Sequence, residues 1–294
     1  MEKMTTKLRK LIESNEFIYT PAAFDALGGR LIKKHGFKVA YCGGYTTGSS
    51  LCVPEPLLTR NEQISFANSV GNDLGLPVVI DAGAGWGEPL HNMRTVRECI
   101  KSGIAGAHFE DQLYPKRAHY HKYVAWAIPA EDFYTKIKMV CIERDNLDKD
   151  FVVIARTDVC RSEGYKEAIK RINKSKDLGA DMGLLFPRSH EEAVSAPKDS
   201  KLPLVYVQSR GNRDGRPLYT NNQLAEMGYK MCIDAQILLM VSYHYCDQAL
   251  KQIKETSAYS DIGNDIFIER RKEIEDIIGL EEMYKIEEET VEGK

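Results

Sequence analysis

The chain has 294 residues, of which 43% are hydrophobic and 28% are charged, and its formal net charge is −3. This balance gives no general attraction to nucleic acid or to an anionic membrane surface, so we expect neither as a partner. No apolar run approaches the roughly 20 residues of a membrane-spanning helix, and the N-terminal segment lacks the apolar core of a signal peptide. The seven cysteines are odd in number and lack a CxxC pair, which favours reduced, buried thiols in a cytoplasmic protein.

Short apolar segments alternate with longer amphipathic segments along the chain. The apolar runs are continuous, which is typical of strands covered on both faces. We predict eight such strands: Phe17–Thr20, Val39–Cys42, Val78–Asp81, Ala105–Glu110, Phe151–Asp158, Met182–Phe186, Leu204–Gln208 and Met231–Asp234. The segments between them have helical periodicity, as in Asn61–Leu74, Met93–Lys101, Ala130–Arg144, Lys166–Leu178 and Asn222–Met227. This alternation predicts an α/β fold, a (β/α)₈ TIM barrel, and the lack of a GxGxxG motif disfavours an open dinucleotide-binding sheet.

Local signals agree with these boundaries. Thr59 precedes Glu62 at the spacing of a capping box, and Pro129 leads a helix with acidic residues in its first turn. After the eighth strand, two more helical patterns span Leu238–Thr256 and Asp265–Ile278, and the acidic tail from Glu281 is expected to fray. We therefore predict one barrel domain over residues 1–294, whose C-terminal helices at 238–280 pack on a neighbouring subunit.

Titratable residues follow several strands at the end where a barrel of this type has its active site. Asp81 ends the third strand and Glu110 the fourth, and two such carboxylates suit a hard divalent cation such as Mg²⁺. The fifth strand brings Arg156 and Asp158 near its end, and Arg156 would contact a substrate carboxylate or neutralise the buried acids. His108 is either a ligand contact or a satisfied core histidine.

A glycine-containing segment after the second strand offers exposed backbone amides. Cys42, Gly43 and Gly44 would hold a carboxylate or a phosphate through these groups. The loop after Asp81 reads AGAGWG, and its glycines allow the backbone to pass close to a ligand or a metal ion.

The chain resembles the isocitrate lyase / phosphoenolpyruvate mutase superfamily over nearly its whole length. The matching segments are PAAFDALGGRLIKKHGFKVAYCGG, IDAGAGWGEP, GIAGAHFEDQLYPKR, FVVIARTD and LAEMGYKMCI, in this order. The resemblance implies a TIM barrel in a homodimer or homotetramer. It also implies Mg²⁺ and a small 2-oxo or 2-hydroxy carboxylic acid as substrate, with carbon–carbon or carbon–phosphorus chemistry through a pyruvate-like enolate.

The resemblance also implies roles for single positions. The segment Cys42–Gly44 matches the loop that binds the substrate carboxylate, and Asp81 matches the metal-binding acid of DADxGYG. Glu110 matches the glutamate of EDQ, which holds the metal through water. Lys116 matches the lysine of the gating loop, and Arg156 matches the arginine of ARTD.

The departures from the family pattern concentrate on the ligand side. Gly83 replaces the second acid of DADxGYG, which would weaken the metal site, with Glu88 as a candidate substitute. Glu55 replaces an aspartate near the substrate. The lyase signature KRCGH reads KRAHYH, so Ala118 stands at the position of the catalytic cysteine. The usual glutamate after the sixth strand falls at Phe186 or Arg188, and the asparagine after the seventh at Val207 or Gln208.

These observations predict a Mg²⁺-assisted lyase with a re-specialised site. The acid and base work lost with the cysteine would pass to His119, Tyr120 or His121, because imidazole titrates near neutrality. A phosphonopyruvate-type hydrolase or mutase is the alternative enzyme, since LYPK resembles LFPK of those enzymes. A non-catalytic carboxylate-binding barrel is the alternative from another class. The sequence does not name the substrate.

Overall fold

The computed structural model describes residues 2–72, 74–118, 124–212 and 215–292. The chain divides into two compact units, Met1–Leu239 and Met240–Lys294, and the boundary falls inside helix α10. Within the described residues, no helix is both long and apolar enough to cross a membrane.

The first unit contains a sheet of eight parallel strands in the order β1-β8-β7-β6-β5-β4-β3-β2 among its described residues. The strands are β1 Ile18–Pro21, β2 Ala40–Cys42, β3 Val78–Asp81, β4 Gly106–Glu110, β5 Val152–Arg156, β6 Met182–Leu184, β7 Leu204–Gln208 and β8 Met231–Asp234. A single parallel bridge between Ala22 and Tyr41 joins the β1 and β2 edges. The predicted (β/α)₈ barrel is therefore confirmed.

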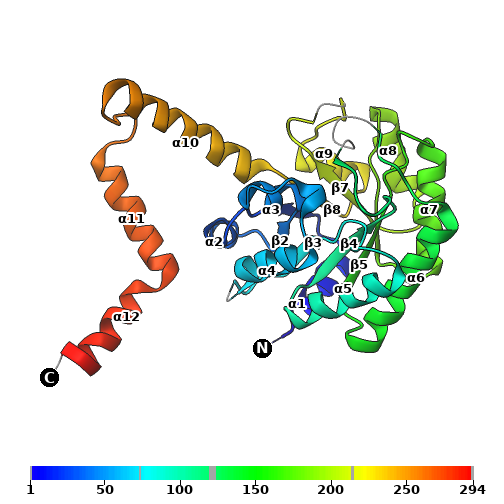
Figure 1. Ribbon diagram of the computed structural model, residues 1–294, viewed down its shortest axis with the longest axis horizontal. Helices are drawn as coiled ribbons and strands as arrows, with labels where there is room; N and C mark the ends of the chain where they lie inside the picture. The colour runs from blue at the N-terminus through cyan, green and yellow to red at the C-terminus, as the bar shows by residue number, and fades with distance from the viewer. Residues whose placement is uncertain (1, 73, 119–123, 213–214, 293–294) are drawn as a thin grey trace. The chain divides into compact units, whose positions relative to one another are not determined.

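Helices surround these strands (Figure 1). They are α1 Met4–Glu13, α2 Ala26–Lys34, α3 Gly44–Ser50, α4 Arg60–Gly71, α5 Pro89–Lys101, α6 Ala130–Leu147, α7 Tyr165–Asp177, α8 His190–Asp199 and α9 Asn221–Met227, with the short 3₁₀ helix η1 at Glu55–Leu57. The predicted capping box forms at α4, where the Thr59 side chain and Glu62 satisfy each other's backbone amides. All seven cysteines are free thiols, and only Cys52 and Cys246 are exposed.

The barrel has two apolar layers because successive strand residues point to opposite faces. One layer fills the interior with side chains such as Val79, Ile154 and Met182, and Leu8 of α1 belongs to it. The other layer lies between strands and helices, and includes Ile80 and Phe109. This alternation leaves His108, next to Phe109, on the interior side.

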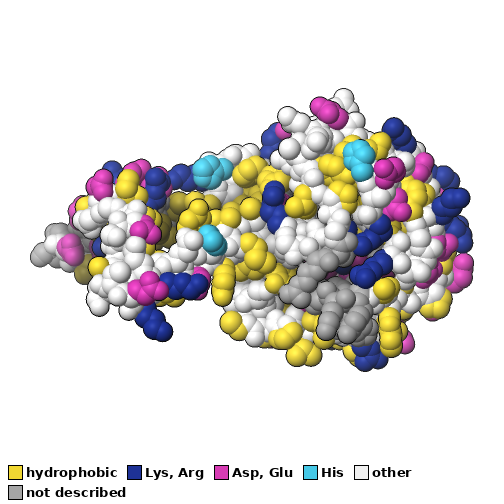
Figure 2. Space-filling view, turned by 90° about the horizontal axis from the view of Figure 1, so that it is seen from above, with side chains coloured by type: hydrophobic (Ala, Val, Ile, Leu, Met, Phe, Trp, Pro, Cys, Tyr) yellow, Lys and Arg dark blue, Asp and Glu magenta, His cyan; other side chains and the backbone are white. Residues whose placement is uncertain are grey.

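The second unit consists of the C-terminal helices. They are α10 Ile237–Thr256, which begins in the first unit, α11 Asn264–Ile278 and α12 Leu280–Glu287, followed by a π-helical turn at Glu288–Glu292. The expectation that the tail frays from Glu281 is wrong, because α12 carries apolar residues at helical spacing between its acids. None of the described residues of these helices is buried, and apolar side chains lie among the charged ones on their surface (Figure 2).

Candidate active site

Four titratable residues meet at the carboxyl ends of β3, β4 and β5 because of the strand register. Asp81 pairs with His108 on the adjacent strand, and Glu110 pairs with Arg156. All four side chains are at least nine-tenths buried. The predicted convergence of Asp81, Glu110 and Arg156 thus follows from neighbouring strands ending at one mouth.

Arg156 connects three carboxylates. Its guanidinium nitrogens lie 3.4 Å from Asp81 Oδ2, 3.1 Å from Glu110 Oε2 and 3.2 Å from Asp158 Oδ1. Burial raises the pKa of Glu110 to about 7, although Lys116 and Arg156 act in the opposite direction. Burial would also raise the pKa of Asp81, but neighbouring positive charge outweighs it and holds that pKa below its usual value.

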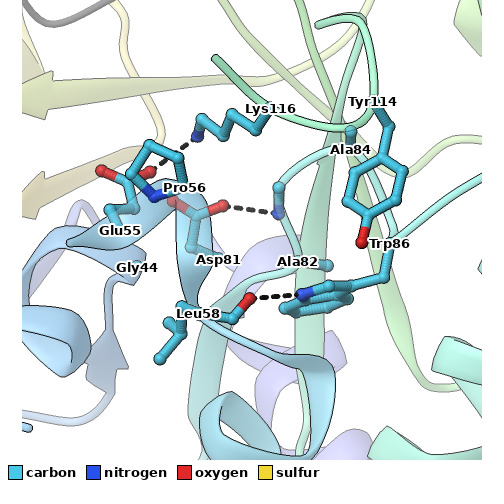
Figure 3. Close-up of a pocket in the computed structure, with 11 residues that line it drawn as sticks. Gly44, Glu55, Pro56, Leu58, Asp81, Ala82, Ala84, Trp86, Tyr114 and Lys116 are labelled. Carbon is cyan, nitrogen blue, oxygen red and sulfur yellow. Dashed lines mark hydrogen bonds and ion pairs between the residues drawn. The ribbon is translucent and has the colours of Figure 1, made fainter. Parts of the chain in front are cut away.

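Lys116 adds a second cation from the loop between β4 and α6. Its Nζ lies 2.6 Å from Glu55 Oε1 and 3.1 Å from Glu110 Oε1, and Figure 3 shows it reaching over Asp81 toward Glu55 on η1. Gly44 borders the same carboxylates, since a Cβ built on it would lie 3.2 Å from Glu55 Oε1 and 3.3 Å from Asp81 Oδ2. The loop lysine and the Glu55 position therefore join the strand-end cluster.

His108 bridges the cluster and the barrel interior. Its Nε2 lies 2.7 Å from the Tyr41 hydroxyl, and its Nδ1 lies 3.4 Å from Asp81 Oδ1. Burial lowers the pKa of His108 to about 4 and raises the pKa of Tyr41 well above its usual value. The phenol therefore donates to Nε2 of a neutral imidazole, whose Nδ1–H faces Asp81. The pKa of Asp81 is lowered by His108, Arg156 and Lys116 together, because the imidazole takes up its proton in the same acidic range in which Asp81 titrates.

A buried network holds the two ends of the loop that carries Lys116. Arg171 of α7 donates through one nitrogen to Asp111 Oδ2 and to the carbonyl of Ile128, each at 3.0 Å. Ile128 N donates to Asp111 O at 2.8 Å, and Leu113 N donates to Trp126 O at 2.7 Å. The stem of the loop is thus closed by backbone pairing and anchored on α7.

The same network reaches the active site through Asp111. The carboxylate of Asp111 accepts hydrogen bonds from Thr157 Oγ1 at 2.5 Å and from the backbone of Asp158 at 2.9 Å. Asp158 in turn accepts from Gln112 Nε2 at 3.0 Å and pairs with Arg156. Asp111, Arg171 and Tyr41 are not among the site residues predicted from the sequence, although the EDQ segment contains the first.

A small cavity lies over Asp81. Its volume is about 40 Å³, which holds a few water molecules but not a whole substrate. It is lined by Gly44, Glu55, Pro56, Leu58, Asp81, Ala82, Gly83, Ala84, Trp86, Tyr114 and Lys116. The Trp86 indole donates to the carbonyl of Leu58 at 2.9 Å and so fixes one wall. The loop requires glycine at position 85, where φ is +76° and a Cβ would lie 1.8 Å from Asn92 Oδ1.

The residues fit Mg²⁺ as an ion that keeps most of its water. Among the described residues, no three histidine, cysteine, aspartate or glutamate side chains are grouped to coordinate a metal by themselves. Both carboxylate oxygens of Glu110 are nevertheless buried, and among the described residues they form ion pairs with Lys116 and Arg156 but no hydrogen bond of good geometry. A Cβ on Gly83 would lie 3.8 Å from Glu110 Oε1, so the missing family acid leaves space beside these oxygens. Hard oxygen donors with room for water suit Mg²⁺, and Asp81 and Glu110 are the residues that would hold it.

The other residues that were predicted for the site differ in where they lie. The Cys42 side chain packs in the outer apolar layer, so this residue can reach a ligand only through its backbone. A Cβ on Gly43 would lie 2.8 Å from the ring of Tyr41, which explains the glycine there. Glu88 is exposed at the start of α5 and does not line the cavity. His119, Tyr120 and His121 lie outside the described residues, and the expectation that they act as acid or base stays a prediction.

The β6–β8 side of the mouth has a different character. Phe186 follows β6, Val207 lies in β7 and Ala235 follows β8, and all three pack against the interior apolar layer. Gln208 is buried instead, and its side chain binds the backbone of Tyr219. Phe186 and Val207 therefore present apolar groups here, while the family's glutamate still falls at Phe186 or Arg188 and its asparagine at Val207 or Gln208.

Comparisons with known proteins show the family of the chain. The family described as Phosphoenolpyruvate phosphomutase matches residues 8–254. The chain is 30% identical to 2,3-dimethylmalate lyase of Eubacterium barkeri over 291 residues, which cover 98% of each chain. It is 32% identical to the chloroplastic carboxyvinyl-carboxyphosphonate phosphorylmutase of Arabidopsis thaliana over 268 residues, covering 88% of this chain and 77% of the relative.

A solved structure shares this fold. Oxaloacetate acetylhydrolase in complex with the inhibitor 3,3-difluorooxalacetate superposes with a TM-score of 0.87 at 29% identity, and 97% of each chain is covered. The family match, the identities and the shared barrel lead to one conclusion. The chain is a member of the phosphoenolpyruvate mutase/isocitrate lyase superfamily.

Proposed function

We propose that the chain is a Mg²⁺-assisted carbon–carbon lyase that acts on a small 2-oxo or 2-hydroxy carboxylic acid through a pyruvate-like enolate. The observation that carries this proposal is the convergence of Asp81, Glu110 and Arg156 at three adjacent strand ends, with Lys116 above them. The superfamily comprises carbon–carbon lyases and hydrolases of small oxo acids. The names of two relatives, 2,3-dimethylmalate lyase and oxaloacetate acetylhydrolase, support an acid substrate of this size.

In this proposal each side chain has a defined task. Arg156 and the backbone of Gly43 and Gly44 grip the substrate carboxylate, because guanidinium and amide groups donate to carboxylate oxygens. Mg²⁺, which members of the superfamily typically use, would supply Lewis-acid polarisation of the adjacent substrate oxygen when held by Asp81 and Glu110. Lys116 adds positive charge where the enolate oxygen develops.

Proton transfer is assigned to the loop. His119 and His121 stand where related lyases place cysteine and histidine, and an imidazole is a suitable acid or base near neutral pH. His108 is not offered for this role, because it is neutral, buried and engaged by Tyr41. Its task is to orient Asp81.

A substrate screen tests the proposal. The purified chain would be incubated with 2-hydroxy and 2-oxo monoacids, diacids and phosphonates, with and without Mg²⁺, while pyruvate, oxalate and phosphate are followed. We expect Mg²⁺-dependent release of an oxo acid from at least one hydroxy acid, and loss of this release in Asp81→Asn. Turnover that persists unchanged in Asp81→Asn, or in the double variant His119→Ala/His121→Ala, would remove the corresponding residues from the mechanism.

Carbon–phosphorus chemistry is the second candidate. The observation in its favour is the 32% identity to a carboxyvinyl-carboxyphosphonate phosphorylmutase, together with the LYPK segment that ends at Lys116. Release of phosphate from phosphonopyruvate, without oxo-acid release from any hydroxy acid, would replace the lyase proposal with this one.

We also propose that the chain is a homodimer or homotetramer assembled through its C-terminal helices. Helix α11 carries exposed apolar residues at positions that share one face, including Phe267 and Ile274. Light scattering after size exclusion should give a multimer for the wild type and smaller species for Phe267→Ser/Ile274→Ser. The matched variant Lys272→Ser changes one charged residue of the same helix and should keep the multimer.

A further inference from the structure

Lys136 is a buried lysine beside the carboxylate cluster, and the proposed function gives it no task. It lies on α6 and is 4% exposed. Its Nζ donates to the carbonyl oxygen of Glu110 at 3.0 Å and to that of Ala84 at 3.3 Å. Among the described residues, both of its hydrogen-bond acceptors are thus backbone groups rather than carboxylates. Lysines are rarely buried so deeply without a paired charge, which points to a task for this nitrogen.

The two acceptors belong to the two segments that carry the acids of the site. Glu110 is the last residue of β4, whereas Ala84 belongs to the loop 82–87, which follows Asp81 at the end of β3. Ala82, Gly83 and Ala84 of this loop line the cavity over Asp81 (Figure 3). One nitrogen atom therefore joins the backbone of the loop to the end of the neighbouring strand.

The backbone of the loop 82–87 needs support from its surroundings. Positive φ angles occur at Gly83, Gly85, Trp86 and Gly87. The φ of +58° at Trp86 is unfavourable for a residue with a Cβ, so neighbouring groups must hold this conformation. The loop therefore keeps its shape through contacts with the elements around it.

Successive carbonyl groups of the loop are held by different elements. The backbone amide of Glu110 in β4 donates to Gly83 O at 2.9 Å. The hydroxyl group of Thr95 in α5 donates to Gly85 O at 3.2 Å. Lys136 of α6 holds the carbonyl group between these two, and of the three donors it is the charged one.

The loop in turn orients the carboxylate of Asp81. Gly83 N donates to Asp81 Oδ1 at 2.7 Å. A path of contacts therefore runs from Lys136 through the loop to the carboxylate of Asp81, and a second contact runs from Lys136 to the backbone of Glu110.

We propose that Lys136 is a positioning residue, which clamps the loop 82–87 to the end of β4 and thereby fixes the distance between the carboxylates of Asp81 and Glu110. This inference rests on the proposed function, in which these two acids hold Mg²⁺. Ligands that are held in place before an ion arrives lose less conformational freedom when it binds. The clamp should therefore strengthen the binding of Mg²⁺.

The sign of the effect distinguishes a clamp from a simple charge. A positive charge close to the site repels Mg²⁺, so the removal of a lysine that acts only through its charge would raise the affinity for the ion. The removal of a lysine that only stabilises the fold would lower the unfolding midpoint and leave the affinity as it is. A clamp instead predicts a lower affinity for Mg²⁺ when the lysine is removed.

Three variants measure this sign. Lys136→Met keeps the length of the side chain but lacks its N–H donors, and calorimetric titration of the full-length chain should give a Mg²⁺ affinity about 10- to 100-fold below that of the wild type. Lys136→Arg keeps the charge and the donors in another geometry and should give an intermediate affinity. Lys138→Met removes an exposed lysine of the same helix and should bind Mg²⁺ as the wild type does.

A second measurement needs no metal. Hydrogen–deuterium exchange of the metal-free chain, followed by mass spectrometry, reports how often the loop 82–87 opens. Peptides that cover this loop should exchange about 10-fold faster in Lys136→Met than in the wild type, because a hydrogen bond from a charged donor is lost. Peptides from β7 should exchange at the wild-type rate, which separates a local loosening from global unfolding.

The outcomes separate two failures. If the wild type binds Mg²⁺ but Lys136→Met binds it as tightly or more tightly, or if the exchange of the loop is unchanged, the clamp is wrong and the proposed function stands. If the wild type does not bind Mg²⁺, the metal assignment in the proposed function is wrong, and the exchange rates alone decide whether Lys136 clamps the loop. If Lys136→Met does not fold, Lys136→Arg takes its place, and wild-type values in both measurements would overturn the clamp.

Discussion

On the β2–β5 side of the barrel mouth, the carboxylates of Asp81 and Glu110 share Arg156, and the ammonium of Lys116 closes the cluster. On the β6–β8 side, the apolar groups of Phe186 and Val207 face the same opening. The first side is held by interactions between opposite charges, so each residue depends on the others. The second side is held by packing, which tolerates changes of shape. We therefore propose that the chemistry belongs to the charged side and the choice of substrate to the packed side.

The largest expected effect is at Arg156. Changing Arg156 to Gln leaves three buried carboxylates without their shared cation, which should cost about 3–5 kcal/mol of unfolding free energy. The loss of the group that binds charge in the transition state should lower kcat/KM by about 100- to 1000-fold. Arg156→Lys keeps the positive charge but lacks the planar guanidinium with its paired N–H donors. Compared with Arg156→Gln, it should therefore recover more of the stability than of the activity. Equal recovery of both would show that the planar geometry is unimportant.

Substitution of Arg171, which anchors the stem of the loop that carries Lys116, should have the next largest effect on stability. Arg171→Gln leaves Asp111 as an unpaired buried charge, so we expect a loss of about 3 kcal/mol in chemical denaturation. The neighbouring variant Lys170→Gln removes a cation that pairs with Glu167 at the surface and should cost less than about 1 kcal/mol. Similar losses in both variants would mean that the Asp111 network does not stabilise the fold.

A substitution at Gly83 should strengthen the charged side, whereas the substitutions above weaken it. In Gly83→Asp, a carboxylate enters the space beside Glu110, and the affinity for Mg²⁺ should rise by about 10- to 100-fold. The φ of +50° at this position is tolerated by Asp and Asn better than by other side chains. Gly83→Asn therefore serves as the control of equal shape. Calorimetric titration with Mg²⁺ would show no gain in either variant if the ion does not bind here.

The smallest effect is expected on the packed side. Val207 is half-buried, and Val207→Ala removes apolar surface worth about 1 kcal/mol while leaving Mg²⁺ affinity unchanged. Val152→Ala, at a fully buried position of the same interior layer, should cost more because it leaves a cavity. A change of metal affinity in Val207→Ala would show that the two sides are coupled.

Much of the barrel could be predicted because buried parallel strands have continuous apolar runs. The bounds of β3, β7 and β8 agree with the prediction residue for residue. The prediction did not include α3, whose Gly-, Thr- and Ser-rich sequence has low helix propensity, or α8, which contains Pro197. Both helices depend on tertiary contacts that the local pattern does not contain.

The site divides in the same way. Asp81, Glu110 and Arg156 could be grouped because parallel strands end at one edge, so sequence position determines proximity. Lys116 was assigned to the gating loop by resemblance, but its contact with Glu55, 61 positions away, depends on how the loop closes. The role of Tyr41 could not be predicted because its apolar neighbours are typical of an ordinary core strand. The role of Arg171 could not be predicted because charged residues are typical of the surface of an amphipathic helix.

The burial of Lys116 means that the rate at which its amine reacts with a chemical reagent can report on the loop. Its side chain is only 8% exposed, whereas those of Lys3, Lys10 and Lys38 are more than half exposed. Amine-reactive acylating reagents should therefore modify Lys116 far more slowly than surface lysines while the loop is closed. Peptide mass spectrometry of a timed acylation would measure how often the loop opens, without any knowledge of the substrate.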